Sequence, residues 1–129
     1  MEKILVVDDD TDLVDATVNL LTAKGYAATG AHSGEEGFAM AKAESPDLML
    51  LDVMMATDGE GFEIARRLKA DPATKTIPVI IVTGIRSAKG LPFGFEPDDD
   101  WLPVKAVLEK PVKPDELLRA VEAALKKQE

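Results

Sequence analysis

The chain has 129 residues, of which 46% are hydrophobic, so it is long enough to bury the core of one domain and too short for two of ordinary size. Its formal net charge of -9 argues against direct binding to nucleic acid, because such binding depends on a basic surface. Zero cysteines exclude disulfides, thiolate catalysis and cysteine-ligated zinc. The apolar runs are far shorter than the roughly 20 residues of a membrane span, so we expect a cytoplasmic chain without membrane contact.

The first half of the chain alternates strand-like and helix-like segments. Residues 4–7 are continuously apolar and mostly β-branched, as expected for a strand buried on both faces. A helical pattern begins at about Thr11 and ends before Gly25, which fits a C-terminal cap. Residues 26–31 form a weaker strand pattern. This order of elements predicts a parallel sheet with helices on both faces.

The same alternation continues through the next elements. Ser33 and Glu36 form a capping box, so a second helix is expected from there to about Glu44, with Pro46 beyond its end. Residues 48–51 are apolar and predict a third strand.

The second half contains one segment that breaks the pattern. A third helix is expected over residues 62–70, and a fourth strand over 77–82. Residues 84–103 are interrupted by glycine and proline, so any helix there should be short or irregular. Residues 106–108 predict a fifth strand, and Pro114 is placed to open a closing helix.

Residues suited to phosphate chemistry follow four of these strands: Asp8 and Asp9, Asp52, Thr83 and Lys110. Because the carboxyl ends of parallel strands meet at one edge of a sheet, these side chains should gather there. Crowded carboxylates repel one another unless a cation neutralises them, and Mg2+ prefers such oxygen ligands. The hydroxyl and the ammonium could hold the oxygens of a phosphoryl group. The sequence therefore predicts a magnesium and phosphoryl site.

Other polar residues near this edge have simpler interpretations. Asp10 and Asp12 could be further metal ligands, but acidic residues also favour the start of a helix through its dipole, which is the interpretation we prefer. His32 has no other metal-ligand residue beside it in the sequence and is assigned no role.

Four blocks of the chain resemble, in the right order, the signature blocks of the response-regulator receiver domain: ILVVDDD, LMLLDVMM, VIIVTG and LEKPVKPDELL. The resemblance implies a flavodoxin-like, doubly wound α/β fold whose five-stranded parallel sheet has the order 2-1-3-4-5. It also implies that residues 1–129 are a single receiver domain without an output domain. Such a chain is a phosphoprotein of two-component, phosphorelay signalling that promotes its own phosphorylation and dephosphorylation, and is not an enzyme in the ordinary sense.

The resemblance assigns the acidic residues to two roles. Asp52 matches the phosphoacceptor, and it would also be a ligand of Mg2+, with Mn2+ as an alternative ion. Asp9 matches a direct metal ligand, and Asp8 would act on the metal mainly through water. Met54 would offer its backbone carbonyl to the metal.

The remaining matched positions concern switching and output. Thr83 matches the switch hydroxyl, and Lys110 would pair with a phosphoryl oxygen. Pro111 is a candidate for a cis peptide bond, and an output surface is expected at Val107, Pro111 and Val112. The implied partners are a sensor histidine kinase or a histidine phosphotransfer protein, and a downstream effector protein.

The chain departs from the family pattern at several places. Ala56 stands where receivers usually have proline, and the loop 56–61 looks one residue longer than usual. Val107 replaces the aromatic residue of families with an aromatic switch, and Gly84 stands where alanine is common. We therefore expect an intact site with a readout that differs from the usual one.

Two other functions remain open at this stage. A receiver-like scaffold could bind partners without being phosphorylated. A small phosphatase of the haloacid-dehalogenase type could use Asp8 as its nucleophile, since Asp8 and Asp10 fit the start of its D-x-D-x-T motif. Asp12 occupies the threonine position of that motif, which weighs against the phosphatase.

Overall fold

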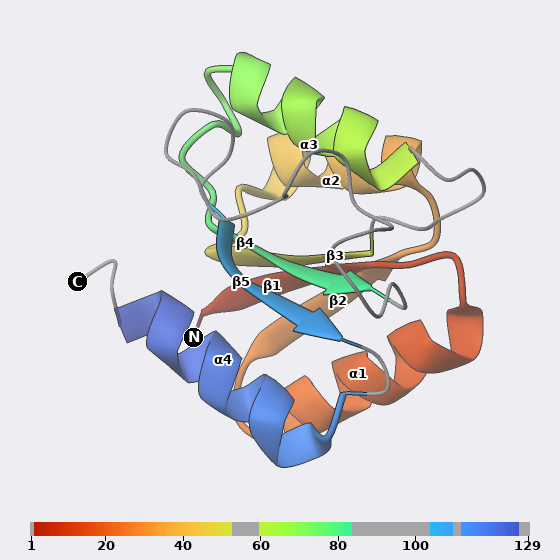
Figure 1. Cartoon of the computed structure of the whole chain (residues 1–129), viewed down its shortest axis with the longest axis vertical. Helices are drawn as coiled ribbons and strands as arrows, with labels where there is room; N and C mark the ends of the chain where they lie inside the picture. The colour runs from red at the N-terminus through yellow and green to blue at the C-terminus, as the bar shows by residue number, and fades with distance from the viewer. Residues whose placement is uncertain (1, 53–59, 84–103, 110–111, 127–129) are drawn as a thin grey trace.

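A five-stranded parallel sheet forms the centre of the molecule in the computed structural model, which describes residues 2–52, 60–83, 104–109 and 112–126 (Figure 1). The strands are β1 (Lys3–Val7), β2 (Ala27–Ala31), β3 (Leu48–Asp52), β4 (Val79–Thr83) and β5 (Val104–Glu109). Their order in the sheet is β2-β1-β3-β4-β5, and all four neighbouring pairs are parallel. The predicted fold class and strand order are thus confirmed.

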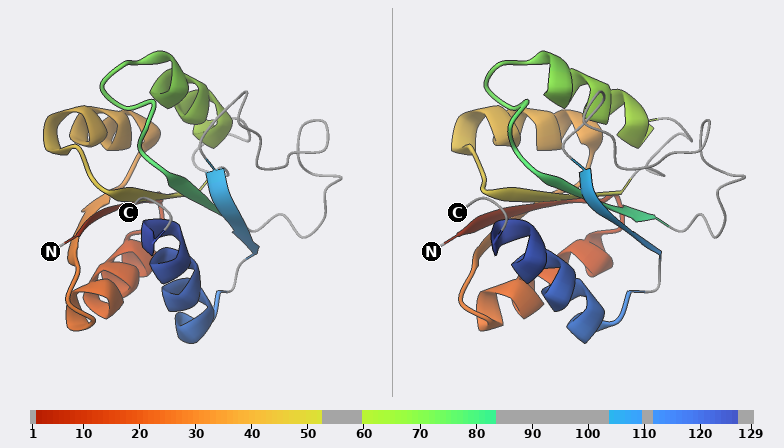
Figure 2. Two further views of the ribbon diagram at one scale, coloured as in Figure 1. Left: turned by 90° about the vertical axis from the view of Figure 1, so that its left-hand side faces the viewer. Right: turned by 60° about the vertical axis from the view of Figure 1, so that its left-hand side comes forward.

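Helices cover both faces of this sheet. They are α1 (Thr11–Ala23), α2 (Gly34–Glu44), α3 (Glu60–Ala70) and α4 (Pro114–Lys126). Figure 2 shows α1 and α4 on one side of the sheet and α2 and α3 on the other. Within the described ranges, no helix has the length and apolar character needed to cross a bilayer. The segment 84–103, where a short or irregular helix was expected, lies outside the described residues.

Alternation along the strands divides the core into two clusters. Leu5, Val7 and Leu51 pack on one face with Ile64 and Leu68 of α3. The intervening strand residues face the other layer, where they pack against Val14 of α1 and Val121 of α4; they include Ile4, Val6, Leu48 and Leu50. All five residues of β3 are buried. Each large apolar side chain removed from water in this way contributes about 1.5–3 kcal/mol before the opposing entropy is counted.

The helix ends follow the sequence signals. The side chain of Asp10 caps α1 by accepting a hydrogen bond from the N–H of Leu13 at 3.2 Å. Ser33 caps α2 in the same way, with Glu36 as the donor at 3.2 Å. Gly25, just beyond α1, has a φ of 96°, a left-handed conformation that glycine adopts without strain. Asp10 therefore lies at a helix start, as the preferred interpretation of this residue expected, and the structure adds that its side chain caps the helix.

Candidate functional site

The candidate site lies where the central strands end. Val7 of β1 pairs with Leu51 of β3, so the next residues along the two strands, Asp8 and Asp52, are neighbours at the carboxyl edge of the sheet. Asp52 is the last residue of β3, and Asp9 follows Asp8. This edge lies where the winding of the sheet reverses, which is where open α/β sheets bind ligands.

The three carboxylates converge. Asp8, Asp9 and Asp52 each offer one oxygen, and these oxygens lie within 4.8 Å of one another. Asp8 and Asp52 are each only 4% exposed, whereas Asp9 is exposed. A hard divalent cation would offset the repulsion between such closely spaced carboxylates, and an all-oxygen donor set fits Mg2+. The predicted gathering of these three side chains is confirmed.

Two backbone groups fix Asp8 in place. Its own N–H donates to the carbonyl of Ala31, at the end of β2, over 3.1 Å. Its Oδ1 accepts a hydrogen bond from the N–H of Asp10 at 3.0 Å. The contribution of Asp10 to the site through its backbone was not anticipated from the sequence, because the type of side chain at a position says nothing about its N–H.

The other two strands bring further predicted positions to the same edge. Asp52 pairs with Val82, so Thr83 is the next residue along β4, and Thr83 pairs in turn with Glu109 of β5. Lys110 follows Glu109 directly in the sequence. The register therefore places the backbone of Thr83 on the strand next to Asp52, and the end of β5 beside Thr83.

The remaining predicted positions fall in different parts of the molecule. Met54, Lys110 and Pro111 lie outside the described residues. Val107 belongs to β5, and Val112 is half-buried against the core cluster that α4 covers. His32 is in the described part, and its Nδ1 lies 3.9 Å from Oε1 of Glu36, one turn further along α2. Among the described residues, the acidic group consists of Asp8, Asp9 and Asp52 and does not include His32.

A doubly wound parallel sheet with three carboxylates at the ends of its central strands defines the flavodoxin-like class of α/β domains with an acidic site. Residues 4–122 match the family model described as the response regulator receiver domain, and the chain belongs to this family. Receiver domains are signalling phosphoacceptors of two-component systems that typically bind Mg2+ and interact with histidine kinases and effectors. This membership leaves the phosphatase hypothesis without support.

Similar proteins include chains much longer than this one and a chain of about the same length. The response regulator PleD of Caulobacter vibrioides is 44% identical over 87 residues, which are 64% of this chain and 18% of PleD. The transcriptional regulator RpaA of Synechocystis is 34% identical, over 98% of this chain and 50% of RpaA. Protein PilH of Pseudomonas aeruginosa is also 34% identical, over 97% of this chain and 98% of PilH. The chain thus spans at most half the length of PleD and RpaA but nearly all of PilH.

Solved structures agree with the fold. A CheY-like receiver domain protein from Methanospirillum hungatei is 32% identical, with a TM-score of 0.81 over 99% of this chain and 96% of that one. The chemotaxis response regulator CheY4 of Vibrio cholerae is 26% identical, with a TM-score of 0.82 over 97% of this chain and 99% of that one.

Proposed function

We propose that this chain is a stand-alone response regulator that accepts a phosphoryl group on Asp52 from the phosphohistidine of a histidine kinase or a histidine phosphotransfer protein. The observation that carries the proposal is the convergence of Asp8, Asp9 and Asp52 within 4.8 Å at the carboxyl edge of the sheet. Protein PilH, matched over 98% of its own length, is a relative of about the same length as this chain, which is compatible with the proposal. On this proposal, residues 1–129 are one receiver domain.

The proposed metal ligands are the three carboxylates and the backbone carbonyl of Met54. Asp9 and Asp52 would bind Mg2+ directly, and Asp8 would act mainly through water. The buried position of Asp8 and its hydrogen bond from the N–H of Asp10 support a fixed, supporting part for this residue. When bound, Mg2+ supplies positive charge that neutralises the carboxylates and draws in phosphoryl oxygens, and Mn2+ could replace it.

The chemistry proposed for the protein is attack by Asp52. One of its carboxylate oxygens bonds to phosphorus, the bond from phosphorus to the donor imidazole nitrogen breaks, and the imidazole leaves with the electron pair. An acyl phosphate on Asp52 results. Thr83 and Lys110, at or just beyond the ends of β4 and β5, would hold the oxygens of the new phosphoryl group. Positioning and charge stabilisation are most of what phosphoryl transfer requires.

The output is proposed to pass through another protein. Val107, Pro111 and Val112 would form the surface that a downstream effector contacts. With valine at position 107, the readout cannot depend on an aromatic ring turning there. We place the exchange in the cytoplasm, which fits a sequence without cysteine, and we expect no direct contact with nucleic acid or membrane.

Acetyl phosphate tests the proposal. The protein is incubated with Mg2+ and acetyl phosphate, and the modified residue is located by mass spectrometry in the parent and in Asp52→Asn. A single adduct on Asp52 that disappears in Asp52→Asn is the expected result. An adduct on Asp8 would indicate the phosphatase chemistry, and the absence of any adduct would indicate a scaffold that is not phosphorylated.

A further inference from the structure

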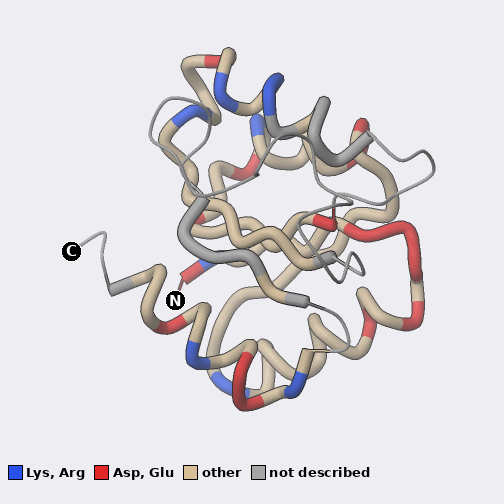
Figure 3. Tube along the Cα trace, in the orientation of Figure 1, with Lys and Arg blue, Asp and Glu red and all other residues tan. Residues whose placement is uncertain are grey.

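Charge is unevenly distributed over this acidic molecule. Residues 64–82 hold four cations (Arg66, Arg67, Lys69 and Lys75) and one anion, Asp71, in a chain whose net charge is -9. Figure 3 shows the cations gathered along the second half of α3 and the turn after it, while acidic residues gather from the end of β1 into α1. The two regions lie on different parts of the molecule.

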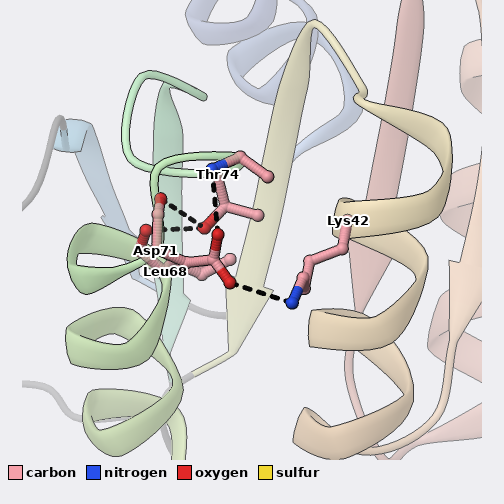
Figure 4. Close-up of polar contacts among 5 residues, drawn as sticks. Lys42, Leu68, Asp71 and Thr74 are labelled. Atoms are coloured by element: carbon pink, nitrogen blue, oxygen red, sulfur yellow. Dashed lines mark hydrogen bonds and ion pairs between the residues drawn. The ribbon is translucent and has the colours of Figure 1, made fainter.

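One of these four cations, Arg67, is used inside the molecule, where Lys42 of α2 lies near it. Arg67 forms an ion pair with Glu35 of α2, and its guanidinium carbon lies 4.4 Å from the centroid of the Phe38 ring. Lys42 of α2 lies 5.6 Å from the same centroid, and its Nζ is 3.0 Å from Oδ2 of Asp71 (Figure 4). Cation–π contacts and ion pairs of this kind hold α2 against α3.

The turn after α3 is tied down in the same place. Oδ1 of Asp71 accepts a hydrogen bond from the N–H of Ala73 at 2.9 Å, and this bond, followed by the one from Lys42, lowers the pKa of Asp71. The buried hydroxyl of Thr74 donates to the carbonyl of Leu68 at 2.6 Å (Figure 4). Asp71, the one anion of the region, is therefore already engaged by Lys42.

Three cations remain, namely Arg66, Lys69 and Lys75, which we call the α3 basic surface. No ion pair involves them in the part of the chain that the structure describes. Arg66 and Lys75 are exposed and Lys69 is half-buried. Arg66 and Lys69 are three residues apart, so they are neighbours on the helix. The helix dipole accounts for Lys69 in the last turn of α3, but Arg66 precedes that turn and Lys75 follows the helix.

This surface lies away from the acidic site. Helix α3 leads from the carboxyl end of β3 back to the start of β4, so its second half and the following turn lie towards the amino edge of the sheet. The carboxylates of Asp8, Asp9 and Asp52 lie at the carboxyl edge. A partner on the α3 basic surface would leave those carboxylates accessible.

We propose that the α3 basic surface binds an acidic segment of a partner protein. Three cations that repel one another, and that form no ion pair among the described residues, gain from a partner that brings carboxylates. A long polyanion such as nucleic acid would meet the repulsion of the whole molecule, whose net charge is -9. A short acidic segment needs only a complementary local surface, so it fits this arrangement better. The inference does not depend on phosphorylation of Asp52.

The test is an NMR titration of the full chain with a hexaglutamate peptide, with a hexaglutamine peptide of the same length as the uncharged control. Hexaglutamate should shift the amide signals of residues 66–77 and leave those of Asp8 and Asp9 in place. The double variant Arg66→Glu/Lys69→Glu should weaken binding by about tenfold or more, because it replaces attraction by repulsion. Lys24→Glu, which reverses one exposed charge beyond the end of α1 in the other helix layer, is the control for charge reversal elsewhere and should bind like the parent.

Each alternative gives a distinct result. Equal responses to hexaglutamate and hexaglutamine would overturn the proposal, as would an equal loss of binding in Lys24→Glu. Tighter binding of a single-stranded oligonucleotide at the same amides would assign the surface to nucleic acid instead. Shifts of these amides with protein concentration, without peptide, would assign it to a second copy of the chain. Circular dichroism checks folding, and Arg66→Gln/Lys69→Gln, which removes charge without reversing it, replaces the double variant if that variant unfolds.

Discussion

Asp10 serves the site and the first helix with different parts of the same residue. Its N–H donates to Oδ1 of Asp8, and its side chain caps α1 at the N–H of Leu13. Asp10→Ala should therefore destabilise the protein by about 1 kcal/mol through loss of the cap, while Mg2+ affinity stays nearly unchanged because the N–H remains. Urea unfolding and calorimetric Mg2+ titration measure the two effects. Asp10→Ser should restore most of the stability, and a tenfold loss of Mg2+ affinity in Asp10→Ala would instead make its carboxylate a metal ligand.

The family pattern assigns Lys110 to the switch, and a substitution of this residue tests that role. Lys110→Ala should leave Mg2+ binding nearly intact, because the metal is proposed to be held by oxygen ligands, while it uncouples phosphorylation from conformational change. The measurement is the set of NMR shifts induced by beryllofluoride, a mimic of the phosphoryl group, in the parent and the variant. Switching in the variant equal to that of the parent would remove Lys110 from the mechanism.

Helix α2 approaches β1 closely enough to require a glycine. A Cβ built on Gly37 would lie 2.8 Å from both Cγ atoms of Val7, the residue before Asp8. Gly37→Ala improves helix propensity by about 1 kcal/mol, but the overlap should outweigh this gain and leave a net loss of about 1 kcal/mol. Chemical denaturation of Gly37→Ala, Val7→Ala and the double variant checks the cause. If the overlap is responsible, Gly37→Ala should cost less in the Val7→Ala background than in the parent.

The link between α2 and the turn after α3 depends on pH. Hydrogen bonds from Ala73 and Lys42 lower the pKa of Asp71 below its usual value near 3.8, so the stability they supply is fully present above that value and is lost as the pH falls through the lowered pKa. Asp71→Asn should thus be less stable than the parent at neutral pH, with a gap that narrows in acid. Urea midpoints over the acidic range measure this. Asp115→Asn, which removes an exposed pair with Arg119, should show a much smaller gap, and a gap for Asp71→Asn that does not depend on pH would contradict the prediction.

Local signals predicted the elements, but the bounds of three of them differ from the expected ones. Apolar runs located the strands, but β4 begins at Val79 and not at Ile77, because the N–H of Ile77 donates to Thr74 within the preceding turn. The fifth strand was predicted only over 106–108, yet its pairing with β4 extends it to Val104–Glu109. The third helix begins at Glu60, two residues before the expected start, where Gly59 and Gly61 give a loop-like composition.

The site was more predictable than the contacts around it. Asp8 and Asp52 follow strands that become neighbours, so the strand order alone brings them together. The pairing of Lys42 with Asp71, and the contact of Arg67 with the ring of Phe38, join residues far apart in the sequence. No local pattern specifies such partners, because they depend on how the two helices pack.

For the molecule as a whole, the net charge of -9 makes stability sensitive to cations. Ordinary salt should raise the melting temperature modestly by screening repulsion between acidic groups. Mg2+ should do more at the same ionic strength, because it binds the folded site; at about a hundred times its Kd the gain is about 2.7 kcal/mol. Thermal unfolding in MgCl2 and in NaCl measures the difference, which should largely disappear in Asp9→Asn. Equal effects of the two salts on the parent would mean that the carboxylates hold no specific metal.

Each helix leads from the carboxyl edge of the sheet back to the amino edge. Residues at the two edges are therefore under different constraints on which amino acids they can be. On the proposed function, residues at the carboxyl edge must keep the oxygens that phosphoryl chemistry requires, whereas folding asks of the second half of α3 and its turn only that they preserve the packing of Ile64, Leu68 and Thr74. Surface residues there can therefore diverge between related chains without disturbing the reaction. Related proteins could therefore come to bind different partners through this surface while the site at the carboxyl edge stays the same.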